Sequence, residues 1–216
     1  SEPIVLEEPN ADVQTVTLPC EIAGRFDQSP DFDHYRFSAK KGETIALEVF
    51  SHRIGVPTDV QLTVRKVGEE KVISESDDPP TFYKPDALND LNLDTYDPAL
   101  TFTADADGEF EATILNQTGS GSAAHLYRLA LRKAKPSFQL LCGTERTKTI
   151  NNDAYPAAPL VRRGGTAIFR VIALRQDGFE GDIVVQAKGL PNGVRAEPLT
   201  LSGKTREGFL TIQAAA

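Results

Sequence analysis

The sequence predicts an all-β chain built from two β-sandwich domains, one over residues 1–135 and one over residues 136–216. Three observations support this prediction. Apolar and polar residues alternate along many short runs, turn residues separate those runs, and the two halves differ in charge. With 216 residues, the chain also exceeds one typical domain of about 100–150 residues.

The expected strands are marked by period-two alternation, because a strand with one buried face places an apolar side chain at every second position. In the first half the alternating apolar sets are Tyr35, Phe37 and Ala39; Ile45, Leu47 and Val49; Val60, Leu62 and Val64; Phe110, Ala112 and Ile114; and Tyr127, Leu129 and Leu131. In the second half they are Phe169, Val171 and Ala173, then Leu210, Ile212 and Ala214. Turns are expected between the runs at Lys41-Gly42, Asp107-Gly108, Gly164-Gly165, Asp177-Gly178 and Pro191-Asn192-Gly193.

The charge distribution supports two modules with separate surfaces. Residues 1–135 carry 24 acidic and 13 basic side chains, a net charge of −11, whereas residues 136–216 carry 7 acidic and 10 basic ones, a net charge of +3. The join is expected within residues 133–137, where Pro136 follows a strand-like run. The total of −8 argues against a nucleic-acid partner, which would need a basic surface.

Several function classes lack their sequence signatures. No run approaches the roughly 18–20 apolar residues of a membrane-spanning helix, so no membrane span is expected in this segment. There is no helical pair of zinc-binding histidines, nucleophile elbow, Walker loop or dinucleotide fingerprint, and no enzyme activity is expected. The sequence also contains no methionine, which indicates a processed chain or a fragment of a longer protein.

One long segment, residues 75–98, interrupts the strand pattern with seven acidic residues and one basic residue. Loops longer than about 12–15 residues are unusual in a compact domain and often functional. Two interpretations stay open: a solvated excursion, or a ligand site in which Phe82, Tyr83 and Tyr96 supply aromatic contact area.

Two further features each allow two interpretations. The acidic segments 7–12 and 31–33 form either a calcium site, since calcium takes six to eight oxygen ligands, or an acidic tail and an ordinary turn. Cys20 and Cys142 either pair as a disulfide in a secreted chain or remain two small buried thiols.

Residues 4–132 resemble the bacterial pre-peptidase C-terminal domain. The resemblance is carried by Glu8-Pro9-Asn10, Gly24, the alternating run from Asp31 through Asp33, Tyr35, Phe37 and Ala39 to Gly42, then Asp59, Leu62, Asp77-Asp78, Asp107-Gly108-Glu109-Phe110, Tyr127 and Leu129. It implies a non-catalytic jelly-roll β-sandwich of the kind attached to exported bacterial proteins, where relatives bind collagen or polysaccharide and some bind calcium. The calcium ligands it implies are Glu8, Asn10, Asp31 and Asp33, although Leu6 and Ala11 stand where further ligands are common.

Residues 137–216 resemble the immunoglobulin-like or fibronectin-like modules that often follow such domains, through the segments 169–181 and 189–194. This second sandwich is expected either to be complete or to lack one edge strand. Together the resemblances imply an accessory pair within a larger secreted, periplasmic or cell-surface bacterial protein. Its expected partners are an extracellular polysaccharide or protein polymer, or the adjacent domains of the parent protein. The alternative is a structural spacer of an exported hydrolase, with no ligand of its own.

Overall fold

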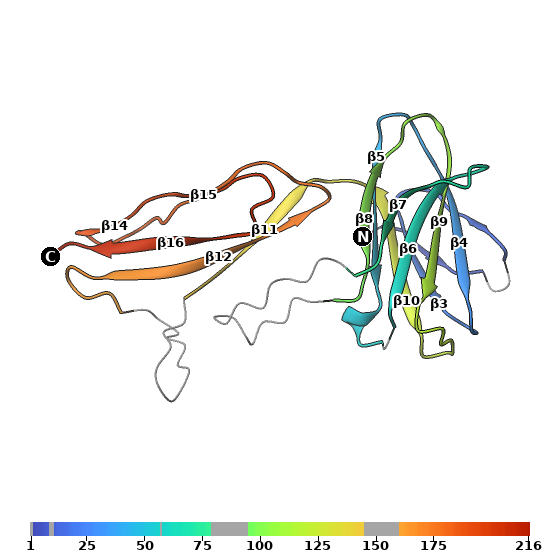
Figure 1. The fold of residues 1–216 in the computed structure, drawn as a ribbon, viewed down its shortest axis with the longest axis horizontal. Helices are drawn as coiled ribbons and strands as arrows, with labels where there is room; N and C mark the ends of the chain where they lie inside the picture. The colour runs from blue at the N-terminus through green and yellow to red at the C-terminus, as the bar shows by residue number, and fades with distance from the viewer. Residues whose placement is uncertain (1, 9–10, 57, 79–94, 145–159) are drawn as a thin grey trace. The chain divides into compact units, whose positions relative to one another are not determined.

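The computed structural model describes residues 2–8, 11–56, 58–78, 95–144 and 160–216 (Figure 1). These residues form two compact units, of which the first ends at Lys135 and the second begins at Pro136. Strands dominate both units, so the prediction of an all-β fold is confirmed. Within the described residues, no helix is long and apolar enough to cross a membrane.

The first unit is a sandwich of two five-stranded sheets. One sheet has the order β1-β3-β10-β5-β8, formed by β1 (Ile4–Leu6), β3 (Cys20–Arg25), β10 (Leu126–Lys133), β5 (Thr44–Phe50) and β8 (Ala99–Thr103). The other has the order β2-β4-β9-β6-β7, formed by β2 (Gln14–Thr15), β4 (Phe32–Ala39), β9 (Gly108–Asn116), β6 (Val60–Lys66) and β7 (Val72–Ser76). A 3-10 turn, η1 (His52–Ile54), follows β5.

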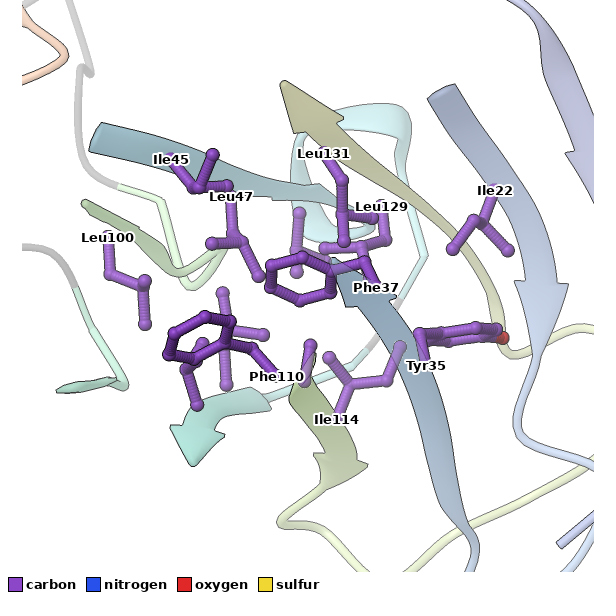
Figure 2. Close-up of a cluster of buried hydrophobic side chains, with 14 of the residues drawn as sticks. Ile22, Tyr35, Phe37, Ile45, Leu47, Leu100, Phe110, Ile114, Leu129 and Leu131 are labelled. Atoms are coloured by element: carbon purple, nitrogen blue, oxygen red, sulfur yellow. The ribbon is translucent and has the colours of Figure 1, made fainter. Parts of the chain in front are cut away.

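The core of the first unit lies between these sheets, and both supply it. Figure 2 shows side chains from the two inner faces meeting, among them Ile22, Leu47, Leu129 and Leu131 from one sheet and Tyr35, Phe37, Phe110 and Ile114 from the other. All five apolar sets predicted for this half are buried. The alternation therefore identified the inner face of each of these strands correctly.

The second unit contains a four-stranded sheet with the order β11-β12-β16-β14 and a separate two-stranded sheet, β13-β15. The strands are β11 (Ser137–Thr144), β12 (Thr166–Gln176), β16 (Glu207–Ala214), β14 (Val194–Ala196), β13 (Ile183–Val185) and β15 (Leu199–Leu201). Its small core joins Val171, Ala173, Ile183, Leu201 and Leu210. A Cβ atom added at Gly208 of β16 would lie 2.8 Å from a Leu201 methyl carbon, so β15 packs very closely on β16 there.

The cysteines do not match either sequence-based interpretation in full. Both are free thiols; Cys20 is buried in the first core, but Cys142 is exposed on β11. The expectation of two buried thiols is therefore wrong for Cys142. Cys142 pairs with the core residue Val171 and lies on the same face of the sheet. Along β11, however, this face is exposed to solvent.

Candidate functional site

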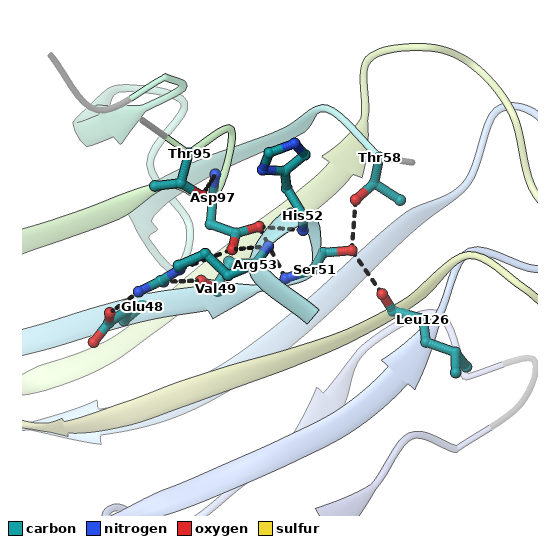
Figure 3. A network of polar contacts seen from close by, with 9 residues as sticks. All are labelled: Glu48, Val49, Ser51, His52, Arg53, Thr58, Thr95, Asp97 and Leu126. Atoms are coloured by element: carbon teal, nitrogen blue, oxygen red, sulfur yellow. Dashed lines mark hydrogen bonds and ion pairs between the residues drawn. The ribbon is translucent and has the colours of Figure 1, made fainter. Parts of the chain in front are cut away.

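The corner after β5 is built around the buried carboxylate of Asp97 (Figure 3). Its Oδ1 accepts hydrogen bonds from the backbone N–H groups of Ser51, at 2.8 Å, and His52, at 2.6 Å. Its Oδ2 accepts bonds from the backbone N–H and from Nε of Arg53, both at 2.9 Å. One carboxylate thus satisfies the backbone N–H groups of Ser51, His52 and Arg53 and fixes the conformation at the start of the 3-10 turn.

The pKa of Asp97 follows from this arrangement. Burial acts to raise the pKa, but the hydrogen bonds from Arg53, Ser51 and His52 outweigh it and hold the pKa below its usual range. Asp97 is therefore charged at neutral pH. In the sequence, Asp97 is only one of the seven acidic residues of residues 75–98, because nothing there shows which of them faces the turn 44 residues earlier.

Arg53 is held on several sides. Its Nη1 donates to Glu48 Oε1 at 2.9 Å, its Nη2 donates to the Val49 carbonyl at 2.6 Å, and its guanidinium lies 4.2 Å from the centre of the Phe50 ring. Such a stacked, hydrogen-bonded guanidinium has lost most of its rotational freedom.

The turn is also tied to the neighbouring strand β10. Ser51 Oγ donates to the carbonyl of Leu126 at 2.6 Å, and Thr58 Oγ1 donates to Ser51 Oγ at 2.5 Å (Figure 3). These bonds anchor the base of the corner within the sandwich.

Tyr96, a predicted ligand contact, lies at the surface of this corner, beside Asp97 in sequence. Its side chain is 52% exposed, and its ring meets His52 edge-on with the ring centres 4.7 Å apart. Phe50, His52, Arg53 and Tyr96 are named the aromatic corner from here on. The other two predicted contacts, Phe82 and Tyr83, lie outside the described residues.

A second polar site involves the predicted calcium ligands Asp31 and Asp33, which lie close to Glu7. These three carboxyl groups are named the acidic motif. A chain of hydrogen bonds runs through it: Tyr35 OH lies 2.5 Å from Tyr127 OH, which donates to Asp33 Oδ2 at 2.6 Å. Asp33 is in turn hydrogen-bonded to Glu7, whose Oε2 accepts a bond from the backbone N–H of Arg25 at 2.7 Å.

Crowding of carboxyl groups changes their ionisation. Burial raises the pKa of Asp33 to about 7, and the charges of Glu7 and Asp31 act in the same direction. Burial also raises the pKa of Glu7, with further increases from Asp27 and Asp31. Asp33 therefore keeps its proton below about pH 7 and can then donate it to Glu7, while the buried hydroxyl of Tyr127 stays neutral because burial raises its pKa.

Gly24 makes this chain of contacts possible. A Cβ atom at this position would lie 2.4 Å from Tyr127 Oη and 2.6 Å from Glu7 Oε2. Distances this short are incompatible with any larger residue unless Tyr127 or Glu7 moves. These contacts explain why glycine, which has no Cβ atom, stands at position 24 of the sequence motif.

The remaining predicted calcium ligands are placed differently. Glu8 is exposed, and its backbone N–H donates to Gln14 Oε1 at 3.0 Å, while Asn10 lies outside the described residues. Asp31 Oδ2 accepts a bond from the backbone N–H of Asp27 at 2.5 Å. It is thus Glu7, one residue before the predicted Glu8, that the structure brings to Asp33.

Another group of carboxylates was not singled out as a metal site from the sequence. The side-chain oxygens of Asp59, Asp77 and Asp78 lie within 4.8 Å of one another, the one such group of three among the described residues. Gln117 Nε2 donates to Asp77 Oδ1 at 2.5 Å, and burial followed by the charges of Asp78 and Asp77 raises the pKa of Asp59. These three residues are named the second acidic group.

Comparisons with known proteins give only distant similarities. No protein-family model and no curated protein matches the chain. The pre-peptidase C-terminal domain of a collagenase from Bacillus anthracis is 10% identical, with a TM-score of 0.40, and the match covers 58% of this chain and 100% of that domain.

Two other solved structures are comparably distant. PliG, a periplasmic inhibitor of g-type lysozyme from Aeromonas hydrophila, is 15% identical with a TM-score of 0.36, covering 56% of this chain and 96% of that one. A GH2 β-galacturonidase from Eisenbergiella tayi is 9% identical with a TM-score of 0.33, covering 88% of this chain and 29% of the enzyme. Because these similarities are distant, the function proposed below is based on the side chains of this chain.

Proposed function

We propose that the chain is a non-catalytic pair of binding modules from a larger secreted, periplasmic or cell-surface protein. Its first module binds an extracellular polysaccharide or protein polymer through the aromatic corner. The single observation that carries this proposal is the exposed ring of Tyr96, which packs against His52 of the turn that the neighbouring buried Asp97 holds in place. Rigid exposed aromatic rings provide large contact area at little cost in conformational entropy.

The chemistry of the corner fits such a ligand. Tyr96 and Phe50 offer aromatic surface, while the tyrosine hydroxyl, the His52 ring and the Arg53 guanidinium offer hydrogen-bonding groups beside it. A sugar ring or a peptide segment presents the same combination of apolar and polar surface.

The test is co-sedimentation of the chain with insoluble collagen, cellulose, chitin and peptidoglycan. Tyr96→Ala is expected to weaken binding about tenfold, the effect of removing one aromatic anchor. Phe32→Ala is the matched control, because Phe32 is 51% exposed on β4 and belongs to no part of the corner. Equal losses in both variants would contradict the site, and absence of binding to every polymer would favour the spacer function.

Calcium binding at the acidic motif is a second part of the proposal. The observation in its favour is that Glu7 and Asp31 lie close to the half-buried Asp33 and that burial, followed by their charges, raises the pKa of Asp33, since a divalent cation would relieve that repulsion. Glu7 is then the motif's N-terminal ligand, and Asp31 and Asp33 are the others.

Melting curves with millimolar calcium and with chelator test this part. Calcium is expected to raise the melting temperature of the unchanged chain and of Asp77→Asn, but not that of Asp33→Asn. The reverse pattern would place the cation at the second acidic group. Coincident curves for the unchanged chain would show that calcium does not bind at millimolar concentration.

A further inference from the structure

Two arginines and one glutamate form a row across the outer face of the sheet β2-β4-β9-β6-β7. Arg36 of β4 and Arg65 of β6 are both cross-strand partners of Glu111, which lies on the central strand β9. The neighbours of these residues along each strand, such as Phe37 and Phe110, are buried in the core, so the row points away from the core. Arg36, Arg65 and Glu111 are named the arginine row.

Glu111 is shared by the two guanidinium groups. Its Oε1 accepts hydrogen bonds from Nε and Nη2 of Arg65, at 3.2 and 2.5 Å, and its Oε2 accepts one from Nη2 of Arg36, at 3.1 Å. Burial acts to raise the pKa of Glu111, but the hydrogen bonds from Arg65 and Arg36 outweigh it and hold the pKa below its usual range. Glu111 is therefore charged at neutral pH and holds both guanidinium groups in place around it.

The arginine row contains more positive than negative charge, because two guanidinium groups share one carboxylate. Among the described residues, no second carboxylate forms an ion pair with either arginine. Other arginines of the first unit are paired differently: Arg128 meets Glu21, and Arg53 meets two acids, Glu48 and Asp97. The arginine row therefore has one positive charge to spare.

Arg36 also has hydrogen-bonding capacity to spare. A guanidinium group has five N–H donors, and Glu111 accepts from Arg36 at Nη2 only. Nε of Arg36 is the one buried side-chain nitrogen or oxygen without a hydrogen-bond partner among the described residues. Elsewhere the row is open to solvent, since the side chains of Arg36 and Arg65 are 32% and 46% exposed. Two accessible guanidinium groups with unused donors are a typical arrangement for binding an oxyanion.

The next row on the same face carries polar groups without formal charge. His34, Thr113 and Thr63 are cross-strand partners in β4, β9 and β6, and all three side chains are half-buried. Nδ1 of His34 lies 2.9 Å from Oγ1 of Thr113. Hydroxyl and imidazole groups can donate and accept hydrogen bonds, as the hydroxyl groups of a sugar do. An anion bound at the arginine row would lie beside groups that suit a sugar ring.

We propose that the arginine row binds the carboxylate group of a sugar acid, either free or as a unit of an acidic polysaccharide. A monovalent carboxylate gives two negative charges facing two positive ones. A divalent phosphate or sulfate would instead add excess negative charge to a unit with 24 acidic and 13 basic residues. This site is separate from the aromatic corner, which follows β5 of the other sheet.

NMR of the arginine side chains tests the proposal with sodium galacturonate as the probe. The chain is labelled with nitrogen-15, and the Nε–H signals are followed near neutral pH at constant ionic strength. Arg36→Lys and Arg65→Lys each remove one signal and so assign it. The signals of Arg36 and Arg65 are expected to shift with the same saturation curve, while that of Arg128, which is paired with Glu21, stays in place.

A second titration distinguishes the two sources of the carboxylate. Trigalacturonate that binds at least tenfold more tightly per carboxylate than galacturonate would indicate a polysaccharide, whereas equal affinities would indicate a free sugar acid. Three results would overturn the proposal: no saturable shift with either probe, equal shifts with the uncharged methyl ester of galacturonate, or an affinity for inorganic sulfate as high as that for galacturonate.

A substitution gives an independent readout through the Arg65 signal. Arg36→Lys keeps the charge beside Glu111 but loses the planar fork, and is expected to weaken galacturonate binding about tenfold. Arg128→Lys is the matched control, because Arg128 is an exposed, ion-paired arginine on the other sheet and should leave the affinity unchanged. Equal effects of the two substitutions would contradict the site. Tyr96→Ala should also leave this affinity unchanged, so the outcome here is independent of polymer binding at the aromatic corner.

Discussion

Two carboxyl groups in the first unit, Asp97 and Asp33, experience opposite electrostatic surroundings. Burial favours the neutral form of both. Asp97 faces four hydrogen-bond donors, which hold its pKa below the usual range, whereas Asp33 faces the carboxylates of Glu7 and Asp31, and its pKa rises to about 7. The neighbours therefore decide the charge, and the charge decides the role: one carboxylate organises a turn, and the other is available to share a proton or a cation.

The largest effect is expected from Asp97→Ala. The substitution leaves the N–H groups of Ser51, His52 and Arg53 without their acceptor, and should lower the free energy of unfolding by roughly 3 kcal/mol or more. Urea denaturation of the first unit measures this loss. Asp77→Ala is the control, since Asp77 is exposed and should change stability by less than about 0.5 kcal/mol. Equal effects of the two substitutions would refute the role given to Asp97.

Gly24→Ala should rank next. The added methyl group would overlap Tyr127 and Glu7, and overpacking of this kind costs about 1–3 kcal/mol. Gly108→Ala provides the comparison, because the nearest atom to its Cβ is a Lys66 side-chain carbon at 3.5 Å. If thermal denaturation shows the Gly24 variant as stable as the Gly108 variant, the close contact at the acidic motif does not exist.

A smaller effect, about 1–2 kcal/mol, is expected from Tyr127→Phe. Its hydroxyl donates to Asp33 and lies in hydrogen-bond contact with Tyr35, so its loss leaves a buried tyrosine hydroxyl without that partner. Because the hydrogen bond from Tyr127 lowers the pKa of Asp33, the variant should also raise that pKa further. Carboxyl-carbon NMR titration reads the shift directly, and a lowered pKa would contradict the assigned direction of the bond.

The smallest expected effect is the change in stability with pH that Asp33 causes. Asp33 has a raised pKa in the folded state, so between about pH 4 and pH 7 the folded chain holds a proton that the unfolded chain has lost. This group's contribution to stability is therefore fully present at low pH and is lost as the pH rises toward 7. Denaturation in chelator should show stability decreasing over this range relative to Asp33→Asn, in which the contribution is absent. Parallel pH profiles for the two chains would show that Asp33 titrates normally.

Much of the first sandwich could be predicted because one face of each strand is buried. Alternation alone located Tyr35, Phe37, Phe110 and Leu129 in the core. The sequence could not reveal which N-terminal acid meets Asp33, because that depends on the register of β1 against β3, in which Leu6 pairs with Ala23. The register places Glu7, and not Glu8, beside Gly24 and Tyr127.

Less of the aromatic corner could be predicted from the sequence. Tyr96 was singled out as an aromatic residue in an acidic loop, but its neighbour His52 comes from a turn 44 residues earlier. The contact depends on the fold, which brings the end of β5 beside the segment that enters β8. In the second unit, alternation predicted the buried Val171 and Ala173, whereas it could not show that Leu140, which pairs with Ala173, is 39% exposed.

Ligand binding at the aromatic corner can be followed by NMR of the tyrosine rings. The chain has five tyrosines, and Tyr96→Phe identifies the signal of Tyr96 among them after carbon-13 labelling of the rings. A soluble fragment of whichever polymer co-sediments is then titrated in. The Tyr96 signals are expected to shift with saturation while those of the buried Tyr35 and Tyr127 stay in place. Saturable binding that leaves the Tyr96 signals unmoved would show that the ligand binds elsewhere.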